Sequence, residues 1–344
     1  MLTKHLVIVV LFLTMIIFCN YSLAQNVSKT GTTAGNFLEI SVGARAIGMG
    51  SAFVSLSNDA TALFWNAAGI SKLKQTEVIL SHTNWIADTK FDFAGVVLLL
   101  GEFGTLGISF TSLSMDDMKV TTIEKPDGTG EFFSAGNLAI GISYSRMLTD
   151  RFSIGFTGKY IQEKIWHMTA TAFAFDAGTL FRTDLLGGMI IGAAISNFGT
   201  PLQLEGRDTQ YFIRIDETKK GSNESIPTNI SLDKWELPLF FRIGVSTEAI
   251  KTGNFRLTVA LDAIYPNNNY PSLNIGTELS FNDFLFIRGG YQSLFLDEAE
   301  GGLSFGAGVN SKMLFSESIV QFDYSYKDFG KLKFVHSFSL RVMF

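Results

Sequence analysis

The chain has 344 residues, a formal net charge of −5, and 47% hydrophobic but only 17% charged residues. Soluble globular domains usually carry about 25% charged residues, so this composition indicates that part of the surface faces an apolar environment. The acidic balance, without a run of basic residues, argues against nucleic acid as a partner.

Residues 1–24 have the pattern of a secretory signal peptide, with Lys4 before an apolar core and a small-x-small cleavage site at 22–24. The apolar core, roughly 13 residues, is short for a membrane-spanning helix, which needs about 20. Phe18 before Cys19 does not fit a lipoprotein signal. Cleavage would remove the only cysteine, which excludes disulfides and thiol chemistry in the mature chain and gives it a net charge of −6.

Residues 25–74 differ in kind from the rest of the chain. After a polar opening they read FLEISVGARAIGMGSAFVSLSNDATALFWNAAGISKL (37–73), with four glycines and many alanines. One short helix is expected here, capped by Asn58 or Asp59. Because small residues permit close packing in a confined space, the segment is predicted to be a plug inside a barrel. A single N-terminal strand of the sheet is the alternative.

From about residue 75 onward, segments of about 10 to 13 residues alternate between apolar and small or polar side chains, as in RFSIGFTGKYI (151–161). The pattern predicts an all-β fold, a 14-stranded antiparallel transmembrane β-barrel over residues 75–344. A soluble β-sandwich or propeller also alternates, but its strands usually have about 5 to 6 residues. Segment 90–100 alternates poorly. The expected strands are 75–86, 90–100, 104–113, 135–147, 151–164, 169–182, 187–198, 236–249, 254–266, 271–281, 284–294, 300–311, 318–327 and 333–344.

Connection lengths give a second indication of a barrel. If the first strand runs outward, the connections after even-numbered strands are short, while the longest, at 114–134 and 199–235, both lie at the extracellular end. Tyr211, Phe212 and Trp235 in the second loop could anchor a protein partner. Ordinary loop packing or an aromatic girdle is the other interpretation of these residues.

The expected inward face carries charges of both signs. A wide ion-selective pore would show a ring of one sign, so the pattern predicts a paired network that fills the lumen, with substrate guidance as the alternative. Lys159, Asp176 and Glu248 lie on the same face. The predicted lumen network comprises Arg242, Arg256, Asp262, Glu278, Arg288, Asp323 and Arg341.

No catalytic constellation is visible in the mature sequence. It lacks HExxH, GxSxG and P-loop motifs, and GMGSAF (48–53) has Phe53 where a dinucleotide-binding fingerprint needs its third glycine. That stretch is predicted to be a close-packed turn. A non-enzymatic protein without a cofactor is therefore expected.

The final segment HSFSLRVMF (336–344) alternates strictly, with His336, Phe338, Leu340, Val342 and Phe344 on one face. Phe344 is predicted to close the barrel against the first strand and to anchor at the periplasmic interface. A terminal aromatic on an amphipathic strand resembles the signal read by the barrel-assembly machinery. Outer-membrane lipid and lipopolysaccharide would then surround the wall.

GARAIGMGSAFVSLSNDATALFWNAAGI (43–70) resembles the N-terminal signature shared by FadL-type transporters and the PorV/PorQ family. The stretches 104–122, 174–183, 194–202 and 237–246 are similar to PorV/PorQ in particular. One departure is Ala67, where the family usually has proline. On this resemblance the plug motif comprises Gly43, Arg45, Gly48, Gly50, Asp59, Trp65, Asn66 and Gly69.

The resemblance implies a fourteen-stranded, FadL-like barrel with an N-terminal plug, in the outer membrane of a Gram-negative cell. PorV-like members serve type IX secretion: they receive cargo with a C-terminal sorting domain and pass it to the surface-attachment machinery. The alternative is a FadL-like transporter of hydrophobic molecules. A transporter needs an apolar pocket inside the barrel, which Phe240 and Phe286 would fit.

Overall fold

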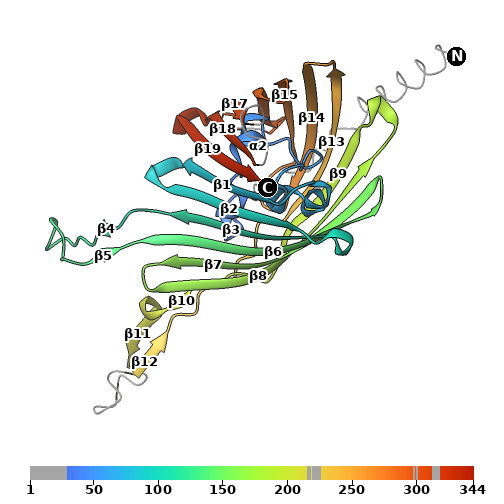
Figure 1. The fold of residues 1–344 in the computed structure, drawn as a ribbon. Coiled ribbons are helices and arrows are strands. Elements are labelled where there is room, and N and C mark those ends of the chain that lie inside the picture. Colours follow the sequence, from blue (N-terminus) through green and yellow to red (C-terminus); the bar gives the residue numbers. More distant parts are fainter. Residues whose placement is uncertain (1–28, 215–217, 219–225, 297–298, 300, 312–317) are drawn as a thin grey trace, which may run out of the picture.

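The structure is a computed structural model, and it describes residues 29–214, 218, 226–296, 299, 301–311 and 318–344. The expected signal peptide at 1–24 lies outside the described residues. Fourteen long antiparallel strands form the wall of a barrel, which closes where β1 pairs with β19 from Glu77↔Met343 to Asn84↔His336 (Figure 1). The predicted fold is confirmed.

The barrel strands are β1 (Glu77–Asn84), β2 (Lys90–Leu99), β3 (Thr105–Ser114), β6 (Ala135–Thr149), β7 (Phe152–Ile165), β8 (Met168–Arg182), β9 (Ile190–Gly199), β13 (Phe240–Lys251), β14 (Phe255–Pro266), β15 (Ser272–Phe281), β16 (Leu285–Leu294), β17 (Leu303–Asn310), β18 (Ile319–Asp328) and β19 (Phe334–Met343). Each expected strand overlaps one of these. The largest shift at a strand start is in β13, which begins at Phe240 instead of residue 236. Its expected first residues instead lead up to the strand, where Leu237 is buried against the plug.

Strand β2 forms although its sequence alternates poorly. Phe91, Phe93 and Val97 point inward and pack in one buried cluster with Leu63 and Ile70 of the N-terminal segment. The apolar residues on its inner side therefore contact other apolar side chains and not a polar lumen, which explains the weak contrast between the two faces of this strand.

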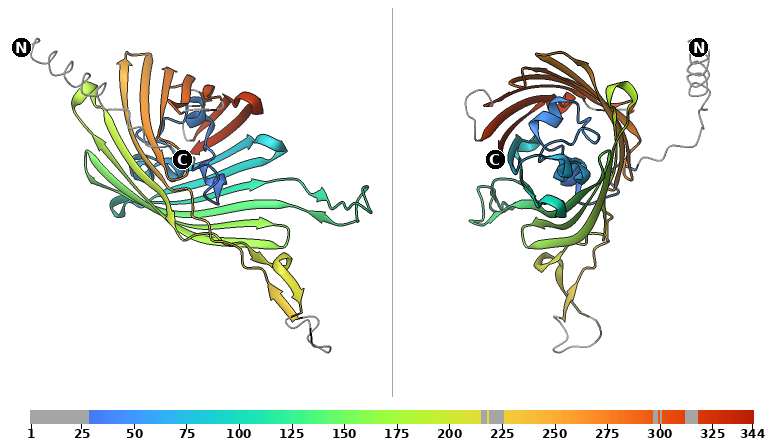
Figure 2. Two further views of the ribbon diagram at one scale, coloured as in Figure 1. Left: turned by 180° about the vertical axis from the view of Figure 1, so that it is seen from behind. Right: turned by 45° about the vertical axis from the view of Figure 1, so that its right-hand side comes forward.

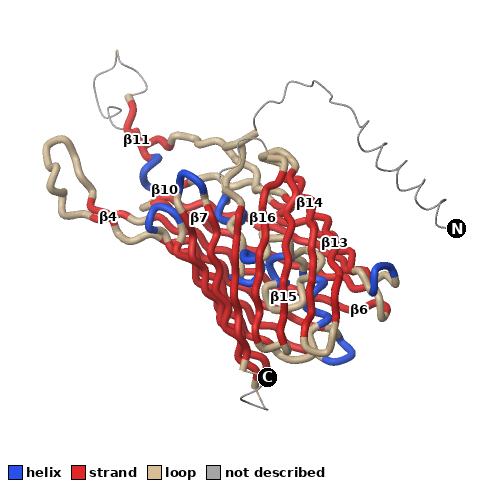
Figure 3. The backbone as a smooth tube through the Cα atoms, turned by 90° about the horizontal axis from the view of Figure 1, so that it is seen from above, coloured by secondary structure: helices blue, strands red, loops and turns tan. Residues whose placement is uncertain are grey.

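Short and long connections lie at opposite ends of the barrel. One end has tight turns, including η4 (Gly101–Phe103) and η5 (Leu185–Gly187). The other end has η3 (Ile86–Asp88), η7 (Gly330–Leu332) and two hairpins that extend beyond the rim (Figures 1 and 3). By the usual rule for such barrels, the end with the long loops is extracellular.

Two hairpins form the long loops. The first contains β4 (Met118–Lys119) and β5 (Phe132–Phe133). The second contains β11 (Gln210–Ile213) and β12 (Ile226–Asn229), and it follows the short β10 (Glu205–Gly206) and η6 (Arg207–Thr209).

The outer face of the wall is apolar. Leu80, Ile142 and Phe173 are 54%, 60% and 65% exposed, and each alternates with a buried neighbour along its strand. An apolar outer face of this kind is the surface that a transmembrane barrel presents to lipid. None of the described helices has the length and apolarity needed to span a membrane.

The N-terminal segment lies inside the barrel (Figure 2, right). It forms η1 (Asn36–Glu39), α2 (Ala44–Gly48), α3 (Ala62–Trp65) and η2 (Ala67–Lys72). The expected capping by Asn58 or Asp59 is wrong, because α3 begins after Thr61. Asp59 instead accepts hydrogen bonds from the backbone N–H and the hydroxyl of Thr61. We call residues 36–72 the plug.

Candidate functional site: a plug held by buried charges

Glycines allow the backbone of the plug to touch the backbone of the wall. Gly50 has φ +62°, and a Cβ placed there would lie 2.5 Å from the backbone nitrogen of Tyr291. A Cβ on Gly290 of β16 would lie 2.2 Å from the nitrogen of Gly50. Gly48 meets Gly306 of β17, where an added Cβ would be 3.0 Å from Cα. At Gly50 and Gly290 a side chain would displace backbone atoms of the plug or of the wall, and at Gly48 the contact is already tight.

The remaining glycines of the plug motif pack within the plug itself. A Cβ on Gly43, which has φ +88°, would lie 2.7 Å from Cγ2 of Thr61. A Cβ on Gly69 would lie 1.8 Å from the carbonyl oxygen of Ser57. These two glycines therefore set the internal fold of the plug.

Asn66 connects the plug to the opposite part of the wall. Its Nδ2 donates to the carbonyl oxygens of Val54 (3.1 Å) and Thr179 (3.0 Å), and its Oδ1 accepts from the backbone N–H of Ala68 (3.2 Å). It thereby caps η2 although Ala67 replaces proline. The indole of Trp65 donates to the carbonyl oxygen of Val42 at 3.0 Å.

A chain of buried ion pairs links the plug to four wall strands. Arg45 of α2 binds Asp59 of the plug at 2.9 Å and Glu278 of β15 at 2.8 Å. Arg288 of β16 joins Glu278 (2.7 Å) to Asp323 of β18 (2.7 Å). Arg341 of β19 lies 3.9 Å from Asp59. We call Arg45, Asp59, Glu278, Arg288, Asp323 and Arg341 the charged anchor.

Glu278 is the centre of the charged anchor because two guanidinium groups share its carboxylate. The Nε and Nη2 atoms of Arg45 donate to its two oxygens at 2.8 and 2.9 Å, and Nε of Arg288 donates at 2.7 Å. Glu278 and Arg288 are 1% and 2% exposed. Buried charges of this kind are tolerated only when they are paired and hydrogen-bonded.

The plug members of the charged anchor both stay ionised. Burial by itself would lower the pKa of Arg45, but Glu278 and Asp59 outweigh that effect and raise it. Burial by itself would raise the pKa of Asp59, but Arg45, Arg341 and a hydrogen bond from Thr61 hold it below its ordinary value. The plug therefore presents one positive and one negative charge to the wall at neutral pH.

A pH dependence of plug stability follows from the lowered pKa of Asp59. A carboxyl whose pKa is lowered by folding contributes stability above its unfolded pKa and loses it as pH falls through the folded pKa. We expect Asp59→Asn to lower the urea midpoint of the vesicle-embedded protein at pH 6. The difference from the wild-type midpoint should shrink at pH 3, which lies below the ordinary pKa of an aspartate carboxyl, because the unfolded chain then binds a proton that the folded, ionised Asp59 does not. Equal midpoint differences at both pH values would contradict this role.

Three residues of the predicted lumen network lie outside the charged anchor. The carboxylate of Asp262 accepts from the plug backbone N–H of Val54 at 2.8 Å. Arg256 pairs with Asp283 (2.9 Å) near the short-turn end and is partly exposed. Arg242 lies in a separate cavity described below. The structure thus brings together four of the seven predicted wall residues: Glu278, Arg288, Asp323 and Arg341.

Two polar wall residues around the charged anchor were not singled out from the sequence. Glu77 of β1 accepts from the plug N–H of Ala60 at 2.9 Å and lies 3.8 Å from Arg341. Gln321 of β18 bonds both Asp323 and Arg341. Both residues occupy inward-facing positions in strands whose side chains alternate between the two faces. The two-residue period of these strands could therefore have identified them from the sequence.

Two polar cavities flank the plug. One, of about 310 Å³, lies toward the short-turn end and is lined by Arg45, Asn58, Arg256 and Glu278 among others. The other, of about 120 Å³, lies toward the long-loop end. Phe240 and Phe286, which could have formed an apolar pocket, are instead covered by guanidinium groups: Arg242 at 4.3 Å and Arg288 at 5.2 Å from the ring centres.

The seam of the barrel includes the last residue. The backbone N–H of Phe344 donates to the carbonyl oxygen of Thr76 at 3.0 Å, and its side chain is exposed. Within the described part of the chain, no group of three or more His, Cys, Asp or Glu residues is placed to hold a metal ion.

The closed wall, its apolar outer face and the plugged lumen define the protein as a plugged outer-membrane β-barrel. The family model described as type IX secretion system protein PorV matches residues 23–234, more than half of the chain. The chain belongs to this family, as the sequence resemblance predicted. It is therefore an outer-membrane barrel of type IX secretion. Neither this family nor the FadL-like channels are enzymes.

Solved structures show the same fold. A FadL homologue of Pseudomonas aeruginosa aligns with a TM-score of 0.50 over 88% of this chain and 98% of its own, at 12% identity. The monoaromatic hydrocarbon channel CymD and the Pseudomonas putida toluene transporter TodX both align with TM-scores of 0.54 and 12% identity, over 88% of this chain and 96% and 97% of theirs. At this identity the likeness shows the fold alone. Comparison with curated proteins gave no match.

Proposed function

We propose that this barrel binds secreted cargo, or the machinery that attaches cargo to the cell surface, through its extracellular hairpins, and that the lumen stays closed. The observation that carries the proposal is the pairing of a plug anchored by buried charges with hairpins that extend beyond the rim (Figure 2). A plug held in this way is more consistent with a protein that docks partners than with a channel that conducts solutes.

The hairpins present apolar side chains to solvent. Tyr211 and Phe212 of β11 are 60% and 64% exposed, and Ile123 and Phe132 of the other hairpin are also exposed. Trp235 stands close to the rim, where its backbone exchanges hydrogen bonds with Leu202 at 2.9 and 2.8 Å. Exposed aromatic side chains are among the residue types that contribute most of the binding energy in protein interfaces.

Transport of hydrophobic molecules is the less supported candidate. The two cavities beside the plug are lined mainly by polar and charged residues, and Phe240 and Phe286 contact guanidinium groups. Desolvating these polar groups would oppose the passage of an apolar solute.

Removing the aromatics of β11 tests the docking role. We expect the Tyr211→Ala/Phe212→Ala variant to recover at least about tenfold less cargo and secretion protein than wild type, because two interface anchors are lost. The measurement is quantitative mass spectrometry of proteins that co-purify with the tagged barrel from its own outer membrane. Phe173→Ala, which removes an exposed aromatic from strand β8, is the matched control and should recover wild-type amounts.

The same purification distinguishes the two functions. Stoichiometric partners with a common C-terminal domain that are lost in the double variant would support docking. Hydrophobic small molecules without protein partners would support transport. Full partner recovery by the double variant would contradict docking through β11.

A further inference from the structure

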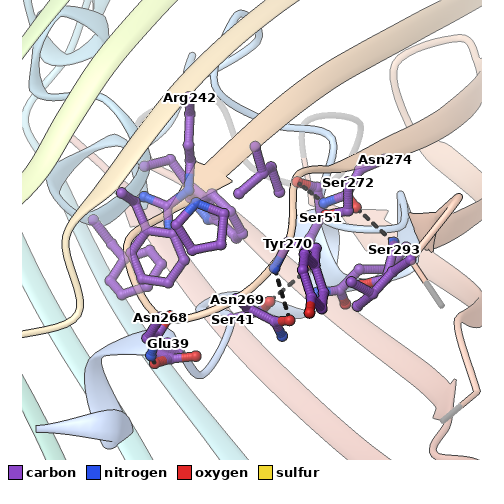
Figure 4. Close-up of a pocket in the computed structure, with 17 residues that line it drawn as sticks. Glu39, Ser41, Ser51, Arg242, Asn268, Asn269, Tyr270, Ser272, Asn274 and Ser293 are labelled. Atoms are coloured by element: carbon purple, nitrogen blue, oxygen red, sulfur yellow. Dashed lines mark hydrogen bonds between the residues drawn. The ribbon is translucent and has the colours of Figure 1, made fainter. Parts of the chain in front are cut away.

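A small polar cavity lies between the plug and the wall toward the long-loop end of the barrel. Its volume is about 120 Å³, room for roughly four water molecules. Figure 4 shows Glu39 beside Asn268 and Ser51 beside Asn274, with Arg242 on another side of the cavity. It differs from the charged anchor because its one buried cation does not belong to that chain of ion pairs.

Arg242 lies over two aromatic rings, and one of its hydrogen-bond donors has no partner within the described residues. Its guanidinium carbon lies 4.3 Å from the ring centre of Phe240 and 5.8 Å from that of Trp65. Nη1 donates to the hydroxyl of Ser196 at 3.2 Å, whereas Nε has no partner among the described residues, although Arg242 is only 5% exposed. A buried guanidinium that stacks on aromatic rings and has an unpartnered Nε suits a carboxylate as its counterion.

The opposite side of the cavity is pre-organised by hydrogen bonds. Nδ2 of Asn268 donates to Oε1 of Glu39 at 2.6 Å and to the hydroxyl of Thr33 at 2.8 Å. Its Oδ1 is buried and has no partner within the described residues. This side therefore has one unpartnered acceptor and one carboxyl, while Arg242 has an unpartnered donor at Nε.

Glu39 limits the charge that the cavity accepts. Burial raises the pKa of Glu39, and Asn268 and Arg242 only partly offset this rise. A carboxylate ligand would be stabilised by Arg242, whereas the acidic side chain of Glu39 would oppose further negative charge, so a monoanion is tolerated better than a phosphate dianion. An apolar ligand would leave the guanidinium donor and the amide oxygen unsatisfied.

We propose that this cavity is a binding site for a small polar molecule that carries one carboxylate, with the guanidinium of Arg242 as its anchor. The site is independent of the docking function proposed above. The cavity volume restricts the ligand to a few heavy atoms, and Glu39 sets its charge preference.

Acetate is the probe for the test, and Trp65 is the reporter because it lines the cavity. The reporter protein carries Trp85→Phe, Trp166→Phe and Trp235→Phe, so that fluorescence reports Trp65 alone. Sodium acetate is titrated against sodium chloride at constant ionic strength. Saturation-transfer NMR on the acetate methyl group gives a second readout in the protein with all its tryptophans.

We expect saturable acetate binding that weakens at least tenfold in Arg242→Gln and in Arg242→Lys. The lysine variant keeps the charge but loses the planar fork, so it tests recognition even if the glutamine variant fails to fold. Glu39→Gln should bind acetate more tightly at pH 7. Arg256→Gln, which alters the other cavity, is the matched control and should bind as wild type does.

Several outcomes would overturn the proposal. Absence of a saturable acetate response by both readouts would show that the cavity holds water only. Unchanged affinity in the lysine variant would show that Arg242 is not the anchor. Tighter binding of inorganic phosphate than of acetate would show that Glu39 does not set the charge preference.

Discussion

Glu278→Gln is expected to lower the free energy of unfolding by about 3–5 kcal/mol, because it leaves two buried guanidinium groups without the carboxylate that they share. Arg45 and Arg288 both donate to Glu278, and the wall residue is almost fully buried. The measurement is urea-induced unfolding of the protein in lipid vesicles, followed by tryptophan fluorescence.

Glu248→Gln is the matched control for this loss. Glu248 also lies in a wall strand and pairs with Lys251 at 2.8 Å, but its side chain is 40% exposed. Exposed pairs of this kind contribute about 0–1 kcal/mol. A change at Glu278 no larger than the change at Glu248 would show that the charged anchor does not hold the plug.

Gly290→Val is expected to prevent the plug from seating and to open the lumen. A Cβ at this position would lie 2.2 Å from the backbone nitrogen of Gly50 and 2.3 Å from the carbonyl carbon of Met49, so a backbone segment must move. Overpacking usually costs about 1–3 kcal/mol and costs more where the neighbour cannot yield. We expect ion conductance across planar bilayers in this variant, and closed channels in wild type.

Gly289→Val provides the control, because it changes the preceding residue of the same strand. An added Cβ at Gly289 would meet only the hydroxyl of Thr277, at 4.0 Å. This variant should stay closed and should protect the plug from proteases as wild type does. Conductance in both variants, or in neither, would refute a steric role for Gly290.

The wall was predictable from the sequence because its chemistry repeats every two residues. Lipid on one side and polar or plug-filled space on the other impose the same alternation on strand after strand. Strand β2 is instructive, since its inner residues Phe91 and Phe93 meet apolar plug residues and the contrast between its faces weakens. Periodicity locates a strand well only where its two sides face different surroundings.

The charged anchor was only partly predictable. The period places Glu278, Arg288 and Arg341 on the inner face, but it does not show which of them meet. The partners of Arg45 depend on the register between strands and on the position of the plug. Both are set by contacts between residues that are more than 200 positions apart in the sequence. Arg45 and Glu278, for example, are separated by 233 positions. For the same reason, the sequence did not separate Arg242 from the other inward charges.

The charged anchor joins residues that are far apart in the sequence, so it can form only late in the assembly of the barrel. Arg45 precedes every wall strand, yet its partners and their neighbours stand on β15, β16, β18 and β19. Until these late strands have joined the sheet, Arg45 and Asp59 of the plug have only each other and lack their wall partners Glu278 and Arg341. Locking of the plug therefore reports that the barrel is complete, and a barrel that stalls before its last strands would keep its plug loose and open to quality-control proteases.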